Sequence, residues 1–395
     1  GIMKTAMEKD PELKLKYSER FFSLSNVQEY EEGTLECYRR FAVADEKRAL
    51  EEELGEWIGA DAGRRERWGS LLGDLDAGYK AISELKRDEN YYRECLVRGS
   101  SAFLVAVRLS GKMKQNWKSI HKLYSSLDLD LERSIFRCCL EEYLSNVSLK
   151  HLGPYQKELL QRFGSDWDAI CSEVWDKSAL SDPERFGKLE KCPELCENDP
   201  LLRFYNDVKI VDFHKEEESL CRKDVLSLGR EYTRALYGMR LDKGIMQYPD
   251  ANSTMRLSYG RVCTLSPRDA VLLDWKTSVA GILQKEEKDS YDFSLRKDWR
   301  DMLETSPFCK RFNWNGEVDF LTDNDITGGN SGSPVLDSRG RLIGLAFDGN
   351  KESLAGDSSY TRDYNKSINV DIRYVLYVLG EYAGMERIIT ALGLR

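Results

Sequence analysis

The stretch TGGNSGSPV, residues 327–335, has the composition of neither a helix nor an ordinary strand. Its glycines at 328, 329 and 332 can adopt backbone angles that are closed to other residues. A tight loop built this way can expose the hydroxyl of Ser331 and turn neighbouring backbone N–H groups toward a carbonyl oxygen that becomes negative. Ser331 is therefore a candidate nucleophile for acyl transfer. The alternative is a glycine-rich turn that only caps a strand, because so short a motif is a hypothesis until its context is known.

The residues around this loop predict a β-rich unit. The apolar runs Val335–Leu336 and Arg341–Phe347 are joined by a polar turn that ends in Gly340, which is the pattern of a β-hairpin. From Val370 to Leu394 the spacing of apolar residues is that of a helix. Further strands are predicted, from alternation or short apolar runs, at 253–260, 261–265 and 319–322.

Residues 1–245 have a helical pattern almost throughout, because apolar residues recur at intervals of three and four. Asp182-Pro183 and Asp199-Pro200 each have the form of a cap residue followed by proline at the first helical position. We therefore predict an α+β chain with an all-α domain at 1–245. A C-terminal domain at 246–395 holds the strands and a closing helix.

Composition argues against several classes of function. There are 59 Lys and Arg against 68 Asp and Glu, a net charge of -9, and no basic block that would follow a phosphate backbone. We therefore expect no nucleic-acid partner. No apolar run approaches the length of about 20 residues that crosses a bilayer, so no membrane span is predicted.

The sequence also gives no sign of a metal or a cofactor. Cys192 and Cys196 are four apart, but no histidine or second cysteine pair lies nearby to complete a zinc site. We expect most of the ten cysteines to be small buried apolar residues. The acidic run 216–218 lacks the oxygen-ligand pattern of a calcium loop, and no glycine-rich nucleotide loop is present.

A nucleophilic serine needs a base to accept its proton and a third group to orient that base. The sequence has three histidines, His121, His151 and His214, all in helical, charge-rich segments. His214, next to an acidic run, is the one that could be fitted into a triad, but we interpret it as a surface histidine on a solvated helix. Either the loop is not catalytic, or its base lies on chain that precedes residue 1. The abrupt start, without the features of a signal peptide, favours a piece of a longer protein.

Four segments together resemble the bacterial dipeptidyl-peptidase 7 and 11 family of serine exopeptidases: 248–257, 328–335, 340–350 and 369–376. The resemblance implies a chymotrypsin-like double β-barrel interrupted by an α-helical cap domain. Residues 1–245 would then be the cap, and 246–395 the C-terminal barrel part. It also implies a homodimeric enzyme of the bacterial periplasm or cell surface that removes dipeptides from peptides with a free N-terminus, without a cofactor.

The same resemblance assigns roles to individual residues. Ser331 matches the family nucleophile, and the backbone amides of Gly329 and Ser331 match its oxyanion hole. Asp348 matches the residue that helps to hold the substrate's N-terminal ammonium, an ion pair that would fix the register at two residues. Gly349 stands where acid-specific members carry arginine, which implies a roomier, uncharged pocket and a hydrophobic P1 residue.

A rival for the specificity pocket is Asp325, six residues before Ser331, where trypsin-like enzymes place the aspartate that selects Lys or Arg. The simpler interpretation is a turn before Thr327, with the carboxylate of Asp325 bonded to nearby backbone.

The sequence departs from the family in one respect. The N-terminal barrel half, which supplies the catalytic His and Asp, has no counterpart here, nor does an asparagine that also contacts the substrate amine. We expect all three upstream, and we expect this chain alone to be inactive and to expose apolar surface where the partner barrel packs. The alternative is a non-catalytic helical interaction protein with a β-rich module, in which the Gly-Asn-Ser-Gly loop is structural.

Overall fold

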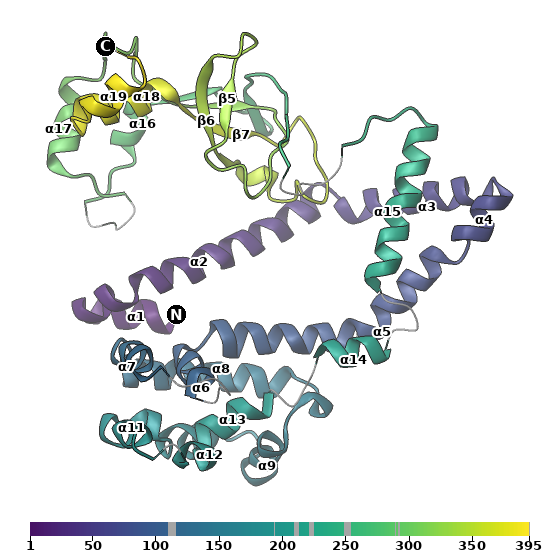
Figure 1. The fold of residues 1–395 in the computed structure, drawn as a ribbon, viewed down its shortest axis with the longest axis vertical. Coiled ribbons are helices and arrows are strands. Elements are labelled where there is room, and N and C mark those ends of the chain that lie inside the picture. The colour runs from purple at the N-terminus through teal and green to yellow at the C-terminus, as the bar shows by residue number, and fades with distance from the viewer. Residues whose placement is uncertain are drawn as a thin grey trace. The chain divides into compact units, whose positions relative to one another are not determined.

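Figure 1 shows the computed structural model, which describes residues 1–109, 116–192, 194–208, 213–220, 225–248, 254–288, 290 and 293–394. The chain divides into two compact units. The first comprises residues 1–26 and 50–247, and the second comprises 27–49 and 248–395. Helix α2 (Pro11–Arg40) contributes to both, because it continues through residues 26 and 27 without a break.

The first unit is helical in its described residues. Besides α2 it contains α1 (Ile2–Lys9), most of α3 (Val43–Gly59), α4 (Ala62–Trp68), α5 (Leu71–Tyr91), α6 (Ser101–Leu109), α7 (Trp117–Ser125), α8 (Leu129–Asn146), α9 (Pro154–Phe163), α10 (Trp167–Cys171), α11 (Pro183–Leu189), α12 (Leu195–Asn198), α13 (Pro200–Val208), α14 (Phe213–Leu220) and α15 (Val225–Asp242). π-Helical turns at Tyr92–Arg98 and Ser172–Asp176 continue α5 and α10, and Leu149–His151 is a 3-10 turn.

Two predicted helix starts are confirmed. The carboxylate of Asp182 accepts a hydrogen bond from the backbone N–H of Arg185 at 2.8 Å, and α11 begins at Pro183. The carboxylate of Asp199 accepts one from the N–H of Leu202 at 3.1 Å, and α13 begins at Pro200. Each aspartate thus satisfies a backbone donor that the first turn leaves without a partner.

The main core of this unit is aromatic. Phe136 of α8 lies edge-on to Phe204 and Tyr205 of α13, with ring centroids 5.7 and 6.2 Å apart. All three rings are buried. Edge-to-face packing is a favoured geometry of aromatic pairs, so these contacts hold α8 against α13.

The second unit contains a sheet of five antiparallel strands in the order β3 (Lys276–Ser278), β4 (Glu317–Thr322), β7 (Ser367–Asp371), β6 (Leu342–Gly349) and β5 (Pro334–Leu336). A separate pair is formed by β1 (Leu265–Arg268) and β2 (Val271–Leu273). The helices of this unit are α16 (Val279–Gln284), α17 (Lys297–Thr305), α18 (Ile372–Tyr377) and α19 (Glu386–Ala391). In Figure 1 the helices α16, α17, α18 and α19 gather beyond one end of the strands.

The predicted hairpin is confirmed, with Val335 of β5 opposite Gly344 of β6. The predicted strand at 319–322 is also confirmed, as the end of β4. Alternate residues of β4 are buried, including Val318 and Phe320, as expected for a strand with one face on a core.

Three sequence predictions are wrong. Residues 254–260 form no strand, although their side chains alternate, and the rest of that prediction lies outside the described residues. Met255 and Leu257 are 99% and 88% exposed, so the alternation has no buried face to stabilise it. The predicted partner at 261–265 is limited to an isolated bridge at Val262 and the first residue of β1. The C-terminal helix begins at Ile372 rather than Val370, because 367–371 is β7.

The fold is thus a mixture of helix and antiparallel sheet, as predicted at that level. Assignment of the sheet to half of a chymotrypsin-like barrel stays a prediction. Within the described ranges, no helix is both long enough and apolar enough to span a bilayer.

Candidate active site

The loop between β4 and β5 has the local geometry that its glycines predict. Gly329 and Gly332 have φ angles of 104° and 82°, which L side chains rarely adopt. The side chain of Asn330 closes the turn by accepting a hydrogen bond from the backbone N–H of Thr327 at 3.1 Å, and the backbone N–H of Asn330 donates to the Thr327 carbonyl at 3.2 Å. Ser331, at the tip, is exposed.

The loop is attached to strand β6 directly after Ser331. The N–H of Gly332 donates to the carbonyl of Ala346 at 2.7 Å, and the N–H of Ala346 donates to the carbonyl of Ser333 at 2.8 Å. These two bonds place the tip relative to the strand that ends in Asp348 and Gly349. Among the described residues, the backbone N–H groups of Gly329 and Ser331 make no hydrogen bond.

The remaining predicted site residues lie at the end of β6. Asp348 is exposed, and its carboxylate accepts a hydrogen bond from the N–H of Gly349 at 2.8 Å. Gly349 is partly buried, and a Cβ atom there would lie 2.4 Å from the Ser353 hydroxyl. A side chain at position 349 would therefore clash with Ser353 unless Ser353 moved.

The carboxylate of Asp325 accepts a hydrogen bond from the hydroxyl of Tyr248. Its bonded partner is thus a distant side chain rather than the nearby backbone that the sequence suggested.

His151 has a role that the sequence did not predict. The ring is 1% exposed, its Nδ1 lies 2.7 Å from Oδ2 of Asp88, and its Nε2 lies 2.8 Å from Oε1 of Glu216. Ionised carboxylates only accept hydrogen bonds, so both ring nitrogens donate when both carboxylates are charged. A ring with both nitrogens engaged has none to offer to a serine hydroxyl.

Asp88 is held ionised by its donors. Burial alone raises the pKa of this carboxyl, but hydrogen bonds from His151, Ser148 and Arg87 outweigh it and leave the pKa below the ordinary value. Asp88 and His151 are 63 positions apart, so no local pattern could reveal the pair.

Of the other two histidines, only His121 has a described side chain. His121 is partly exposed, its Nε2 lies 2.9 Å from a carboxylate oxygen of Glu190, and its ring packs edge-on against Phe186. The side chain of His214 lies outside the described residues. That the base for Ser331 lies on chain preceding residue 1 stays a prediction.

The cysteines differ from the prediction. Of the nine that are described, three are buried, five are partly buried and Cys138 is exposed; all nine are free thiols. Burial raises the pKa of Cys95 to about 11 and of Cys139 to about 12, so both are protonated at neutral pH and are weak nucleophiles.

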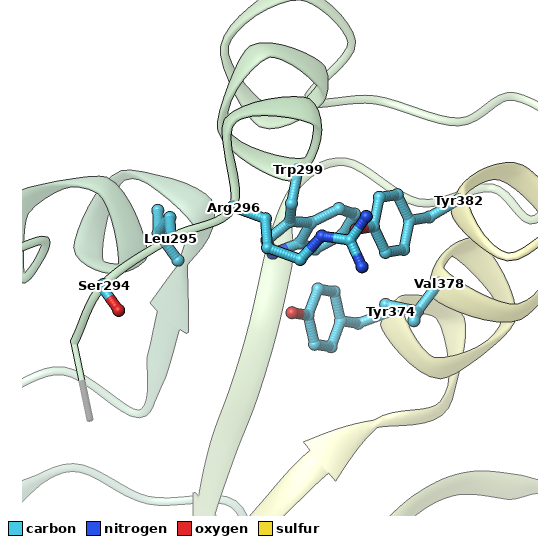
Figure 2. Close-up of a pocket in the computed structure, with 7 residues that line it drawn as sticks. All are labelled: Ser294, Leu295, Arg296, Trp299, Tyr374, Val378 and Tyr382. Atoms are coloured by element: carbon cyan, nitrogen blue, oxygen red, sulfur yellow. The ribbon is translucent and has the colours of Figure 1, made fainter. Parts of the chain in front are cut away.

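A pocket of about 320 Å³ lies elsewhere in the second unit (Figure 2). The rings of Trp299, Tyr374 and Tyr382 form most of its wall, and Arg296 lies across them. Arg296 is paired with Asp298 at 2.9 Å. None of the predicted site residues lines this pocket, and its aromatic side chains also pack on the core around Tyr377, so we assign it no part in the site.

Comparison with known proteins settles the family. The sequence profile of the Peptidase S46 family matches residues 1–394. The chain belongs to this family. It is 29% identical over 411 residues to dipeptidyl-peptidase 7 of Porphyromonas gingivalis, covering 100% of this chain and 57% of that protein. It is also 29% identical over 411 residues to the Asp/Glu-specific dipeptidyl-peptidase of the same organism, covering 98% of this chain and 56% of that protein.

The fold agrees with this membership. The crystal structure of Porphyromonas endodontalis DPP11 superposes with a TM-score of 0.82 at 23% identity, covering 98% of this chain and 58% of that one. The resemblance to dipeptidyl-peptidases 7 and 11 is thereby confirmed. This S46 chain spans less than three fifths of the length of the relatives it matches.

Proposed function

We propose that this chain is the nucleophile-bearing part of a serine dipeptidyl aminopeptidase. Its S46 relatives are named dipeptidyl-peptidases. The observation that carries the proposal is the loop at Ser331, where an exposed hydroxyl stands between glycines in the left-handed region of φ and beside backbone N–H groups that have no acceptor in the described chain.

In the proposed reaction the Ser331 oxygen attacks the carbonyl carbon of the second peptide residue. A histidine oriented by an aspartate, both expected upstream of residue 1, takes the hydroxyl proton and passes it to the departing amine. The amides of Gly329 and Ser331 stabilise the negative oxygen of the tetrahedral intermediate. Water then releases the dipeptide from the acyl-enzyme and restores the hydroxyl.

Asp348 is the proposed partner of the substrate's N-terminal ammonium. Its exposure and its position at the end of the strand that anchors the Ser331 loop support this role. An ion pair at this place allows only two residues between the free amine and the attacked carbonyl. The enzyme would therefore release dipeptides and would not cut inside a chain.

Gly349 is proposed to leave the P1 pocket uncharged, which favours hydrophobic P1 residues. The space that a side chain would need is occupied by the Ser353 hydroxyl. The rival pocket around Asp325 would favour Lys or Arg instead, but its carboxylate is already bonded to Tyr248. Comparable kcat/KM values for Asp or Glu and for hydrophobic P1 residues would contradict the hydrophobic preference.

The remaining features of the proposal follow from the resemblance alone. They are a double β-barrel with 1–245 as helical cap and 246–395 as the C-terminal barrel part, a homodimer, and a place in the bacterial periplasm or on the cell surface. On this proposal the 395 residues alone are inactive, because the base is supplied from outside them.

The direct test uses the longer parent protein, its Ser331→Ala variant and the 395-residue chain. Each is treated with a fluorophosphonate probe, and the labelled peptide is identified by mass spectrometry. We expect labelling at Ser331 in the parent alone. A parent that hydrolyses dipeptide substrates but is labelled at another serine, or whose Ser331→Ala variant keeps full activity, would overturn the assignment.

A further inference from the structure

The loop that follows β6, residues 350–359, contacts both parts of the candidate site, and we call it the bracing loop. At its start, the hydroxyl of Ser353 occupies the space beside Gly349. Near its end, the carboxylate of Asp357 accepts a hydrogen bond from the hydroxyl of Thr327 at 2.8 Å. We call residues 327–333, the part of the β4–β5 connection that presents Ser331, the nucleophile loop. Thr327 is its first residue, so one segment touches the nucleophile loop and the strand end proposed to shape P1.

The bracing loop is itself rigidly built. The N–H groups of Ser358 and Ser359 donate to the carbonyl of Ala355 at 3.0 and 2.8 Å, and these bonds enclose Asp357. At the other end, the buried side chain of Asn350 donates to the carbonyl of Tyr364 at 2.8 Å. Asp357 therefore projects from a fixed turn rather than from a free loop.

The end of α2 and the start of α3 hold the bracing loop from outside, within the same unit. The polar contacts are an ion pair of Lys351 with Glu36 at 2.9 Å, a hydrogen bond between the hydroxyls of Tyr38 and Ser358 at 2.6 Å, and a hydrogen bond from Ser359 to Glu46. The apolar contacts form a small core of Cys37, Phe41, Val43, Leu354 and Ala355. These contacts hold the bracing loop in place without any contribution from the nucleophile loop.

The nucleophile loop, by contrast, has few restraints on its first half. Thr327 is joined to Asn330 by the two hydrogen bonds that close the turn, and only from Gly332 onward is the backbone bonded to β6. Among the described residues, the Thr327–Asp357 bond is the side-chain contact that ties Thr327 to a part of the structure outside the turn. Movement of Thr327 would carry with it Asn330 and the amide of Gly329.

We propose that Asp357 is a positioning residue for Ser331: through Thr327 it holds the nucleophile loop in the conformation that aims the hydroxyl and the Gly329 amide at the scissile carbonyl. This inference rests on the proposed function. Because reaction rates fall steeply when reacting groups are displaced by about 1 Å, loss of this contact reduces the chemical step more than it reduces substrate binding or the stability of the fold.

The test uses the longer parent protein and two matched pairs of variants. Thr327→Val keeps the shape but removes the hydroxyl, whereas Thr327→Ser keeps the hydroxyl. Asp357→Ala removes the acceptor, whereas Asp357→Asn keeps an acceptor oxygen without the charge. Asp363→Ala is the control for loss of an exposed acidic side chain in the same region. The readouts are the rate of fluorophosphonate labelling at Ser331, kcat and KM for a dipeptide substrate, and the melting temperature.

We expect Thr327→Val and Asp357→Ala to lower the labelling rate and kcat by about tenfold or more, with KM and melting temperature close to those of the parent. Thr327→Ser, Asp357→Asn and Asp363→Ala stay within about twofold of the parent. The double variant Thr327→Val/Asp357→Ala is no slower than either single variant, because both remove the same interaction.

The inference is overturned if Thr327→Val and Asp357→Ala label within about twofold of the parent, or if their losses follow a fall in melting temperature. It is also overturned if the two effects are additive. A parent that is not labelled at Ser331 at all is a different result, because it removes the proposed function and not only the contact.

Discussion

The buried histidine of the first unit and the exposed serine of the second unit differ in what surrounds their reactive groups. His151 has a carboxylate on each ring nitrogen and is shielded from water. Ser331 stands at the tip of a loop, beside N–H groups that have no acceptor in the described chain. Asp88 and His151 are the residue types of the acid and the base in a catalytic triad. The second ring nitrogen of His151, however, faces Glu216 and not a serine. Residue type alone therefore does not identify a candidate site. The better indication is a polar group that has no partner in the described chain.

The prediction with the largest expected effect tests whether Ser331, rather than His151, is the reactive group, and its readout is catalysis. In a protein that also carries the proposed upstream base, Ser331→Ala is expected to reduce the proposed hydrolysis of dipeptide substrates by about 10³-fold or more, because the proposed nucleophile is lost. The free energy of unfolding is expected to change by less than about 0.5 kcal/mol, since the side chain is exposed. Steady-state kinetics and urea unfolding measure the two. Residual activity above a tenth of the parent's would show that Ser331 is not the nucleophile.

His151→Ala is expected to show the opposite pattern. It removes a hydrogen-bond donor from the fully buried carboxylate of Asp88, and depriving a buried charged group of a partner costs about 3 kcal/mol. His121→Ala is the matched control, because its ion pair with Glu190 is exposed and contributes less than about 1 kcal/mol. Urea unfolding of the 395-residue chain compares them. Equal destabilisation by the two substitutions would contradict the structural role of His151.

A smaller effect is expected at Gly332. Alanine at a φ of 82° is strained by about 1–2 kcal/mol, and the loop is expected to relax away from its present conformation. Gly328→Ala is the control, because Gly328 lies outside the left-handed region and a Cβ atom there meets nothing within 4 Å. In the parent protein, Gly332→Ala is expected to slow fluorophosphonate labelling, and Gly328→Ala is not. If both label at the parent's rate, the glycine geometry is not what presents Ser331.

The smallest expected effect is on the pH dependence of stability, through the cluster of His151, Asp88 and Glu216. The pKa of Asp88 is lower in the folded chain than its ordinary value, so the folded state binds fewer protons there than the unfolded state. Its contribution to stability is present above the unfolded pKa of about 3.9 and is lost as the pH falls through the folded pKa. The difference in unfolding free energy between the wild-type chain and Asp88→Asn is therefore expected to shrink below about pH 4. A difference that grows on acidification would reverse the sign of this linkage.

Local patterns were enough to predict the hairpin of β5 and β6 and the starts of α11 and α13. In each case the residues that determine the structure lie within a few positions of one another, as Asp182 and Arg185 do. The strand predicted at 253–260 failed because alternation says nothing about whether a buried face is available. Strand β7, with the polar residues Ser367, Asn369 and Asp371 buried, was missed because its stability comes from β4 and β6 on either side.

The same distinction applies to the candidate site. The composition of residues 327–335 was enough to predict a glycine-dependent loop, and the positive φ angles of Gly329 and Gly332 agree with that prediction. The partner of Thr327 is 30 positions away, and the partners of His151 are 63 and 65 positions away. Such pairs depend on the packed structure and leave no trace in the local sequence.

The cluster at His151 also has a consequence for proton exchange. A ring N–H of His151 that donates to the buried carboxylate of Asp88 keeps its proton inside the helical unit, away from bulk water. Such a proton leaves only when the surrounding helices open, so its persistence reports local unfolding of that region. A ring N–H signal of His151 that outlasts that of His121 after transfer into heavy water would make this histidine a probe of how often the helical unit opens locally.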